Sequence, residues 1–227
     1  MNTKILALST ATEECSVALS INNKLYTRSE ISPQQHAKKI LPMVDEVLKE
    51  ANVNLSEIDA IAYNRGPGSF TGIRIGVSIA KGLGFAENLP MVGISNLKAI
   101  AQSAYRQLGL TRVACAIDAR MNEVYWGCFT HQEDGNWKEV DTECVISLGD
   151  LTKHLFNDKL IWGTAGTGWS TYPKKLGKFI KNYQNSQILY SQAQDIAYLA
   201  KFELLKGNAT DAEQANPVYL RDIILKK

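Results

Sequence analysis

The order of strand-like and helix-like segments, which occurs twice along the chain, most constrains the fold. Each half begins with three β-rich segments, followed by a helix, a further strand and a second helix. Hairpins followed by helical crossovers require a sheet with antiparallel and parallel parts that helices cover. The sequence therefore predicts two α/β units with a duplicated β-β-β-α-β-α order. The expected strands are 4–8, 14–22, 25–30, 58–63, 90–94, 112–117, 123–129, 138–146, 160–162 and 188–190, and the expected helices are 33–51, 71–86, 95–108, 150–156, 171–179 and 195–205.

Composition and charge exclude several classes of protein. Of the 227 residues, 45% are apolar and 21% are charged, which is an ordinary globular balance. The sequence pI of about 8.2 lies below the value of about 9 that is typical of dedicated nucleic-acid-binding domains. No apolar run reaches the roughly 18 residues of a membrane span. The four cysteines are scattered without a C-x-x-C pair, so we expect reduced, buried thiols in a cytoplasmic protein.

A glycine-rich stretch, "RGPGSFTGIRIGVSIAKGLG", occupies residues 65–84. It lacks the G-x-x-x-x-G-K-[ST] pattern of a P-loop. Its spacing, G-x-G-x-x-x-G, is one residue longer than the dinucleotide fingerprint, and Pro67 removes a backbone N–H from the turn. The sequence therefore predicts neither of these two phosphate-binding loops.

The same stretch places a small residue at every fourth position: Gly72, Gly76, Ala80 and Gly84. At 3.6 residues per turn these positions form one stripe along a helix. Each internal glycine costs about 1 kcal/mol of helix stability relative to alanine, so close packing has to offset the cost. The stripe can pack against the chain's own sheet or against a helix of a partner subunit. The isoleucines on either side indicate a helix that is covered on more than one face, and we expect a partner to take part in this covering.

Four segments together are similar to the TsaB (YeaZ) family of bacteria: "LALSTATEECSVAL", "YNRGPGSFTGIRIGVSIAKGLG", "AIDARMNEVYWG" and "NPVYLR". The resemblance covers nearly the whole chain. It implies the two-lobed actin-like ATPase fold that sugar kinases and Hsp70 share, with RNase H-like lobes. It also implies a role, with TsaD and TsaE, in making N6-threonylcarbamoyladenosine beside the tRNA anticodon. By this resemblance the chain is a scaffold without chemistry of its own, which activates and stabilises TsaD and helps to recruit TsaE.

The resemblance also implies how the chain is divided and where it binds its partner. Residues 1–100 with about 210–227 would form the partner-binding lobe, and residues 101–209 the second lobe. Helices 33–51 and 72–86 would pair with TsaD, or with a second copy when TsaD is absent, and tRNA would be met through the complex. The expected partner-binding residues are His36, Ile40, Val44, Val47, Gly72, Ile73, Gly76, Ile79, Ala80 and Leu83.

The resemblance implies no metal and no catalytic residue. TsaD carries a metal-binding H-x-x-x-H motif in its first helix. Here the first histidine of that motif is present as His36, but Ile40 stands in place of the second. Many TsaB sequences have an aspartate where this chain has Ser9, and a serine lacks the charge that a hard cation prefers.

Some residues would then be remnants of nucleotide-binding loops, or would serve only the local structure. These residues are Ser9, Thr10, Asp118, Gly166 and Gly168. The structural alternative for Asp118 is a hydrogen bond within its own turn or to Arg120, and for the two glycines a change of chain direction. We expect no cofactor on this chain alone, and ATP or ADP, where present, at the TsaD/TsaE interface.

Two alternatives remain open at this stage. The chain could be an enzyme, either a metallopeptidase or an ATP-dependent sugar-kinase-like protein, which metal content or ATP turnover would reveal. Exposed basic residues could touch tRNA phosphates within a complex or could simply be solvated. These residues are Lys38, Lys39, Arg65, Arg74 and Arg120.

Overall fold

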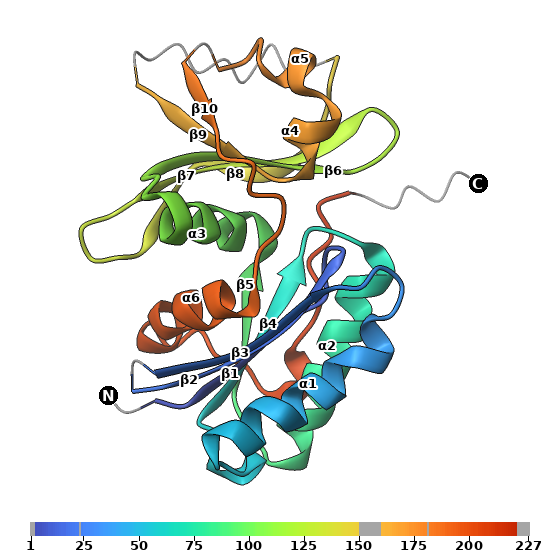
Figure 1. Ribbon diagram of the computed structural model, residues 1–227, viewed down its shortest axis with the longest axis vertical. Helices are drawn as coiled ribbons and strands as arrows, with labels where there is room; N and C mark the ends of the chain where they lie inside the picture. Colours follow the sequence, from blue (N-terminus) through green and yellow to red (C-terminus); the bar gives the residue numbers. More distant parts are fainter. Residues whose placement is uncertain (1–2, 23, 150–159, 181, 222–227) are drawn as a thin grey trace.

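The computed structural model describes residues 3–22, 24–149, 160–180 and 182–221, which form two five-stranded sheets (Figure 1). The first sheet has the order β3-β2-β1-β4-β5 and the second the order β10-β9-β6-β7-β8. The first sheet contains β1 (Ile5–Ser9), β2 (Glu14–Ile21), β3 (Lys24–Ile31), β4 (Ala60–Gly66) and β5 (Met91–Ser95). The second contains β6 (Arg112–Asp118), β7 (Glu123–His131), β8 (Trp137–Ser147), β9 (Trp162–Ala165) and β10 (Tyr183–Asn185).

The two sheets repeat one topology. In each, the first strand pairs antiparallel with the second and parallel with the fourth, as β1 does with β2 and β4, and β6 with β7 and β9. Each sheet thus begins with a hairpin and continues through a helical crossover. The predicted fold class, a mixed α/β fold with a duplicated order, is confirmed.

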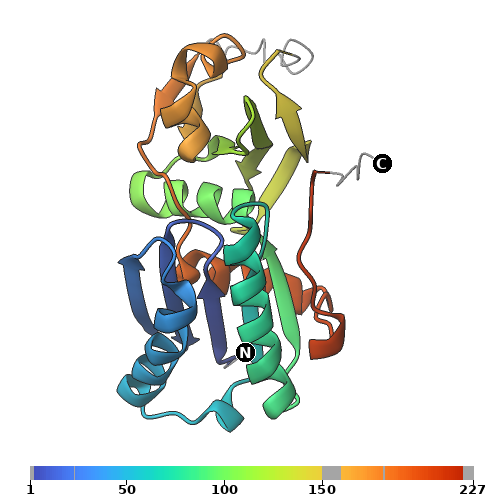
Figure 2. The same cartoon turned by 90° about the vertical axis from the view of Figure 1, so that its right-hand side faces the viewer.

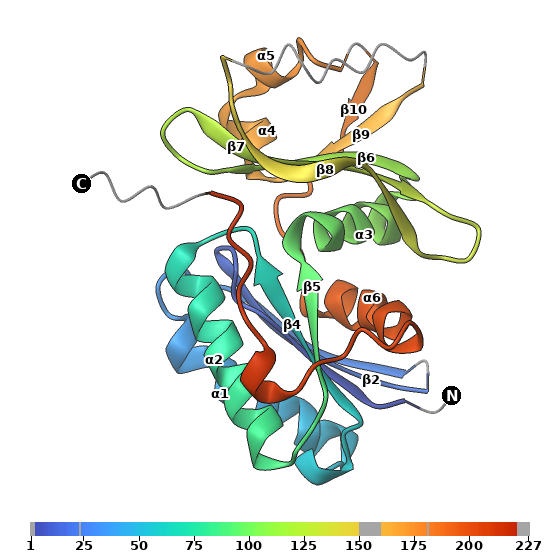
Figure 3. The ribbon, with the colours of Figure 1, turned by 180° about the vertical axis from the view of Figure 1, so that it is seen from behind.

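Helices separate and cover the two sheets. They are α1 (His36–Ala51), α2 (Phe70–Ala86), α3 (Asn96–Leu108), α4 (Thr167–Thr171), α5 (Pro173–Leu176) and α6 (Ala193–Leu205), with short 3-10 turns at Leu55–Glu57 and Ala212–Gln214. Helices α1 and α2 cover the outer face of the first sheet, and α4 and α5 the outer face of the second (Figure 3). Helices α3 and α6 pack on each other between the sheets. Their buried side chains, including Leu97, Ile100, Ile196 and Leu199, form the central core.

The elements differ from the sequence-based expectation in several places. In place of the expected helix 171–179 the structure has the shorter α4 and α5, and the expected strand 160–162 lies at Trp162–Ala165. The first helix begins at His36 rather than Pro33, because Gln34 has a positive φ of 64° and ends the preceding turn. The expected strand 188–190 is wrong, because the edge strand is instead the three-residue β10. The side chains of β10 are a tyrosine, a glutamine and an asparagine, all exposed, so they show no apolar strand pattern. The expected helix 150–156 lies outside the described residues.

The expected division into lobes needs correction at α6. The expected second lobe spans residues 101–209, yet α6 packs directly on β1, β2, β4 and β5 of the first sheet. Helix α3, which begins at Asn96, packs mainly on the second sheet. Two helices, α3 and α6, therefore form the joint between the lobes. Residues 222–227 of the expected first lobe lie outside the described part of the chain.

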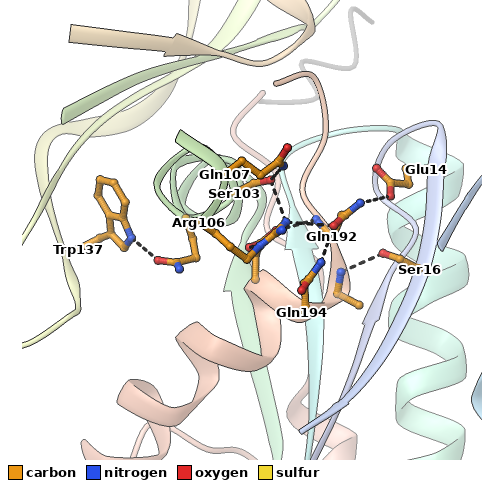
Figure 4. Close-up of polar contacts among 11 residues, drawn as sticks. Glu14, Ser16, Ser103, Arg106, Gln107, Trp137, Gln192 and Gln194 are labelled. Atoms are coloured by element: carbon orange, nitrogen blue, oxygen red, sulfur yellow. Dashed lines mark hydrogen bonds and ion pairs between the residues drawn. The ribbon is translucent and has the colours of Figure 1, made fainter. Parts of the chain in front are cut away.

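A polar network ties this joint together (Figure 4). The guanidinium of Arg106, on α3, donates to both carboxylate oxygens of the fully buried Asp195, on α6, at 2.8 and 3.2 Å. It also donates to the side chain of Gln192, which in turn donates to Glu14 on β2 at 2.8 Å. Ser16 on β2 accepts from the Ala193 backbone N–H at 2.9 Å. One network therefore connects α3, the start of α6 and the first sheet.

Candidate functional site

The apolar stripe of α1 faces the interior of the first lobe. Ile40, Val44 and Val47 are buried there, because positions i, i+4 and i+7 share one helix face. His36 is buried as well, and its Nε2 has no hydrogen-bond partner among the described residues. The structure thus corrects the expectation that these four side chains present themselves to a partner.

The stripe of small residues on α2 is closed by the chain itself. A Cβ added at Gly72 would lie well under 3.0 Å from the backbone oxygen of Thr10, and one at Gly76 equally close to the Thr10 hydroxyl. At Gly84 it would meet the sulfur of Met91. Ile73 and Ala80 are also buried. The small residues therefore admit the loop after β1, and the expectation that a partner's backbone lies along this stripe is wrong.

The outer side of the α1–α2 pair remains open. A groove of about 410 Å³ runs along it, with Ile79, one of the expected partner-binding residues, in its lining. Leu83, a second expected residue, is half-buried one turn further along α2. The groove is lined by Ala37, Phe70, Thr71, Arg74, Ile75, Ser78 and Ile79. We call this surface the α1–α2 groove.

Large apolar side chains surround the α1–α2 groove. Leu41 lies one helical turn from the groove-lining Ala37 and is 47% exposed. Phe70 and Phe85, near the two ends of α2, are 53% and 72% exposed. Exposed apolar residues that gather in this way mark interaction surfaces more often than isolated ones do.

An arginine contacts two aromatic rings at one end of the groove. The guanidinium carbon of Arg74 lies 3.2 Å from the ring centroid of Phe70 and 5.3 Å from that of Tyr219. The two ring centroids lie 5.9 Å apart. The close cation–π contact with Phe70 and the longer one with Tyr219 limit the rotamers of this long side chain, so the groove presents a positioned positive charge.

Tyr219 belongs to a segment, residues 215–221, that we call the strap. The strap rises beside α2 from the first lobe towards the second (Figure 2). The Val218 N–H donates to the Arg65 oxygen at 2.8 Å. Arg221 donates to the Ala119 oxygen at 2.8 Å and forms an ion pair with Glu123, both in the second lobe. A cavity of about 150 Å³ between the lobes is lined by Pro67, Gly68, Phe70, Ile73, Tyr125 and strap residues 218–221.

The start of α2 packs against the first expected remnant of a nucleotide loop, which is Ser9 and Thr10. Ser9 and Thr10 are buried. The Thr10 hydroxyl donates to the Gly72 oxygen at 2.7 Å, and the Ser69 N–H donates to the Ala11 oxygen at 2.8 Å. These groups therefore hold the start of α2 against the loop after β1.

The second set of expected remnants also contacts the chain itself. Asp118 accepts from the Arg120 N–H at 2.9 Å and from the Tyr172 hydroxyl at 3.4 Å. Gly166 and Gly168 lie so close to Ala116 on β6 that a Cβ on either glycine would fall under 3.0 Å from it. The local structure thus accounts for these three residues, as the structural alternative expected.

Comparison with known proteins identifies the relatives of this architecture. Residues 22–218 match the family model described as "TsaD: tRNA N6-adenosine threonylcarbamoyltransferase". The "tRNA threonylcarbamoyladenosine biosynthesis protein TsaB" of Escherichia coli (strain K12) is 41% identical over 99% of this chain and 97% of its own length. Its Haemophilus influenzae namesake is 39% identical over 100% of this chain and 97% of its own. The solved structure "YeaZ from Pseudomonas aeruginosa" superposes with a TM-score of 0.88, at 43% identity, over 96% of this chain and all of that one.

The chain belongs to the TsaB family. The two sheets with one repeated topology are those of the actin-like ATPase fold, and the curated relatives are named for threonylcarbamoyladenosine biosynthesis. The resemblance drawn from the four sequence segments is confirmed.

The thiols of this TsaB-family chain are poorly suited to nucleophilic chemistry. All four cysteines are free. Burial raises the pKa of Cys15 and of Cys144 to about 11, and raises those of Cys115 and Cys128 well above the usual value. Within the described ranges, no group of three or more His, Cys, Asp or Glu side chains is arranged to hold a metal ion. None of the helices in these ranges combines the length and apolarity that a bilayer span requires.

Several residues of the groove escaped the sequence-based prediction. Phe70, Arg74 and Ser78 lie at i, i+4 and i+8 on α2, and this row is the exposed counterpart of the buried stripe two positions away. The spacing alone contained this signal. The contact between Arg74 and Tyr219 joins residues far apart in the chain, and no local pattern indicates it.

Proposed function

We propose that this chain is a non-catalytic docking subunit that binds a TsaD-family subunit through the α1–α2 groove. In this role it stabilises and activates that subunit for N6-threonylcarbamoyladenosine formation on tRNA. The observation that carries the proposal is an apolar groove left open on helices whose inner faces are already fully packed.

The composition of the groove fits a protein partner. Aromatic residues and arginine are enriched at the energetic centres of protein interfaces. The groove has Phe70 and Arg74 at one end and Ile75 and Ile79 along its floor. Burying such a patch against another helix pair would remove the exposed apolar surface from water.

The match to the TsaD family model favours a partner of related fold. Two chains with similar first lobes can pair through equivalent helices about a two-fold or pseudo-two-fold axis. The same groove would then serve a homodimer when the TsaD-family subunit is absent. TsaE would bind to the shared assembly, and ATP or ADP, where they bind, would bind there and not to this chain alone. The reason is that the loops at Thr10 and Gly166 are packed against the chain itself. Any tRNA would be met through this complex.

A substitution at the rim of the groove tests the proposal. Leu41→Arg should weaken association with the TsaD-family subunit at least about fivefold, because interface anchors typically contribute more than 1 kcal/mol each. The measurement is titration calorimetry with the purified subunit, followed by size-exclusion chromatography of the mixture.

Leu205→Arg is the matched control. Leu205 is 70% exposed at the end of α6, on the opposite face of the first sheet, so the same change there should leave association unaltered. Both leucines are exposed enough for the fold to tolerate arginine. If the Leu41→Arg protein binds the TsaD-family subunit as tightly as the wild type does, the groove is not the docking surface.

A further inference from the structure

The turn between β6 and β7 has an uncommon backbone. Arg120, Met121 and Asn122 follow one another with φ values of 64°, 53° and 63°. Left-handed conformations cost roughly 1 kcal/mol or more for each residue with a Cβ. Three in succession persist only where the surroundings fix them.

Neighbouring segments fix this turn from several sides. The Arg120 N–H donates to Asp118 at 2.9 Å, and the Glu123 N–H donates to the Arg120 oxygen at 3.0 Å. The Asn122 oxygen accepts from the N–H of Leu148, just after β8, at 3.1 Å, and the Asn122 side chain accepts from the ammonium of Lys175, on α5, at 2.7 Å. The strap adds its bond from Arg221 to the Ala119 oxygen at 2.8 Å. The turn is therefore held rigidly while its tip points outward.

The tip presents a positive charge that is almost entirely free in water. The Arg120 side chain is 85% exposed, and its ion pair with Asp118 is loose, at 3.6 Å. Met121, beside it, is 84% exposed. The planar guanidinium carries the forked donors that match a phosphate group, and the held backbone fixes only the point from which this side chain extends.

The surroundings of Arg120 add positive charge and an aromatic ring. Lys174 and Lys175 are exposed on α5, and the Lys175 ammonium lies 5.9 Å from the centre of the Tyr172 ring. Among the described residues the turn carries two carboxylates, Asp118 and Glu123, against two arginines, Arg120 and Arg221, and the two lysines of α5. The local balance is therefore basic.

The turn lies on the same side of the molecule as the strap and the start of α2 (Figures 1 and 2). The interlobe cavity brings Tyr125, just after the turn on β7, together with strap residues and with Phe70 at the end of the groove. A partner in the groove would thus leave the turn beside it, uncovered. A long polyanion held by the partner could reach this turn.

We infer that the turn at residues 118–123, with Tyr172 and the lysines of α5, is a contact surface for the phosphate backbone of RNA. This inference rests on the proposed function, which makes tRNA the RNA concerned. Arg120 would donate to phosphate oxygens and Lys175 would add a point charge, without reading bases. An isolated chain of net charge +2 binds RNA weakly, so the contact belongs to the assembled complex.

The test compares Arg120→Glu with Lys138→Glu, which changes the net charge equally at the other end of the second sheet. Each variant is first mixed with the TsaD-family subunit and checked for assembly by size-exclusion chromatography. The assembled complex is then titrated with unmodified tRNA by fluorescence anisotropy at several salt concentrations. Arg120→Glu should lower tRNA affinity about tenfold and reduce the slope of log K against log salt by roughly one.

The accompanying variants make the outcomes separable. Arg120→Lys keeps the charge and should stay within about threefold of the wild type, and Lys138→Glu should match the wild type. Equal tRNA affinities for Arg120→Glu and Lys138→Glu overturn the inference. Failure of Arg120→Glu alone to assemble also overturns it, because the turn would then touch a protein. If the wild-type chains do not assemble, the proposed function fails, and the same titration of this chain alone at low salt decides the role of the turn.

Discussion

Replacing Gly72 with alanine should destabilise the protein by about 2–3 kcal/mol, whereas the same change at Gly82 should stabilise it by up to about 1 kcal/mol. Both glycines lie inside α2. At Gly72 the new Cβ would overlap the backbone oxygen of Thr10, which cannot rotate away. At Gly82 the new Cβ would meet no atom within 4 Å beyond the adjacent turns of its own helix, so the change only improves helix propensity. Urea unfolding of the two variants, followed by circular dichroism, measures both effects.

Gly76→Ala supplies the intermediate case. Its Cβ would meet the side-chain hydroxyl of Thr10, which can turn aside at the cost of its 2.7 Å hydrogen bond to the Gly72 oxygen. The loss should therefore fall between those of the other two variants. Equal stabilities for Gly72→Ala and Gly82→Ala would contradict the packing of the stripe against the loop after β1. The larger substitution Gly76→Arg would disrupt the first lobe itself for the same reason, so it could not be used to test whether α2 binds a partner.

The duplicated architecture could be predicted from the sequence because its signals are local. Alternation in 14–22, continuous apolar strands such as 58–63 and the 3.6-residue period of α1 each depend on neighbouring residues. Their repetition in one order then defines the sheet topology. The α6 position could not be predicted in this way, since a helix that is apolar on most of its surface can cover either sheet.

The docking surface was harder to predict for a physical reason. A row of small residues every four positions looks the same whether its neighbour is another molecule or the chain's own loop. Only coordinates show that Thr10 lies against Gly72 and Gly76. The exposed row that contains Phe70 and Arg74 was visible in the same helix, but exposure depends on where α1 and the strap lie.

The rigid turn at Arg120 was equally hidden. Positive φ values at Arg120, Met121 and Asn122 are imposed by contacts from Leu148 just after β8, from α5 and from the strap. Arginine and methionine have no intrinsic preference for this conformation. Long-range contacts of this kind leave no periodic pattern in the sequence.

Removing the Arg106 side chain should have the largest effect on stability, because it would leave Asp195 buried without a counter-charge. Arg106→Ala should cost about 3 kcal/mol at neutral pH, the lower end of the range for breaking buried ion pairs, since the arginine is itself partly exposed. Asp195 is fully buried, and the guanidinium supplies two of its hydrogen bonds. The joint between α3 and α6 should loosen with it, and hydrogen exchange of the α6 amides should accelerate more than that of α1.

The pH dependence of this loss identifies its cause. Burial raises the pKa of Asp195, and Arg106 opposes that rise, so the variant should raise the pKa further. The unfolded chain ionises alike in the wild type and the variant, so its titration cancels from the difference between them. Below the folded-state pKa of Asp195 in the wild type, both folded proteins hold a protonated carboxyl and the missing charge costs little. As the pH rises above that value the loss should grow, and it should level off once the pH passes the still higher folded-state pKa of the variant.

Arg28→Ala distinguishes this mechanism from the loss of any ion-paired arginine. Arg28 also pairs with two carboxylates, Glu46 and Glu50, but on the surface between β3 and α1. Solvent screens such pairs, so the variant should unfold close to the wild type at every pH. Urea unfolding at pH 4, 6 and 8 compares the two. A loss for Arg106→Ala that is the same at pH 4 and pH 8 would mean that packing of its side chain, and not the charge of Asp195, holds the two lobes together.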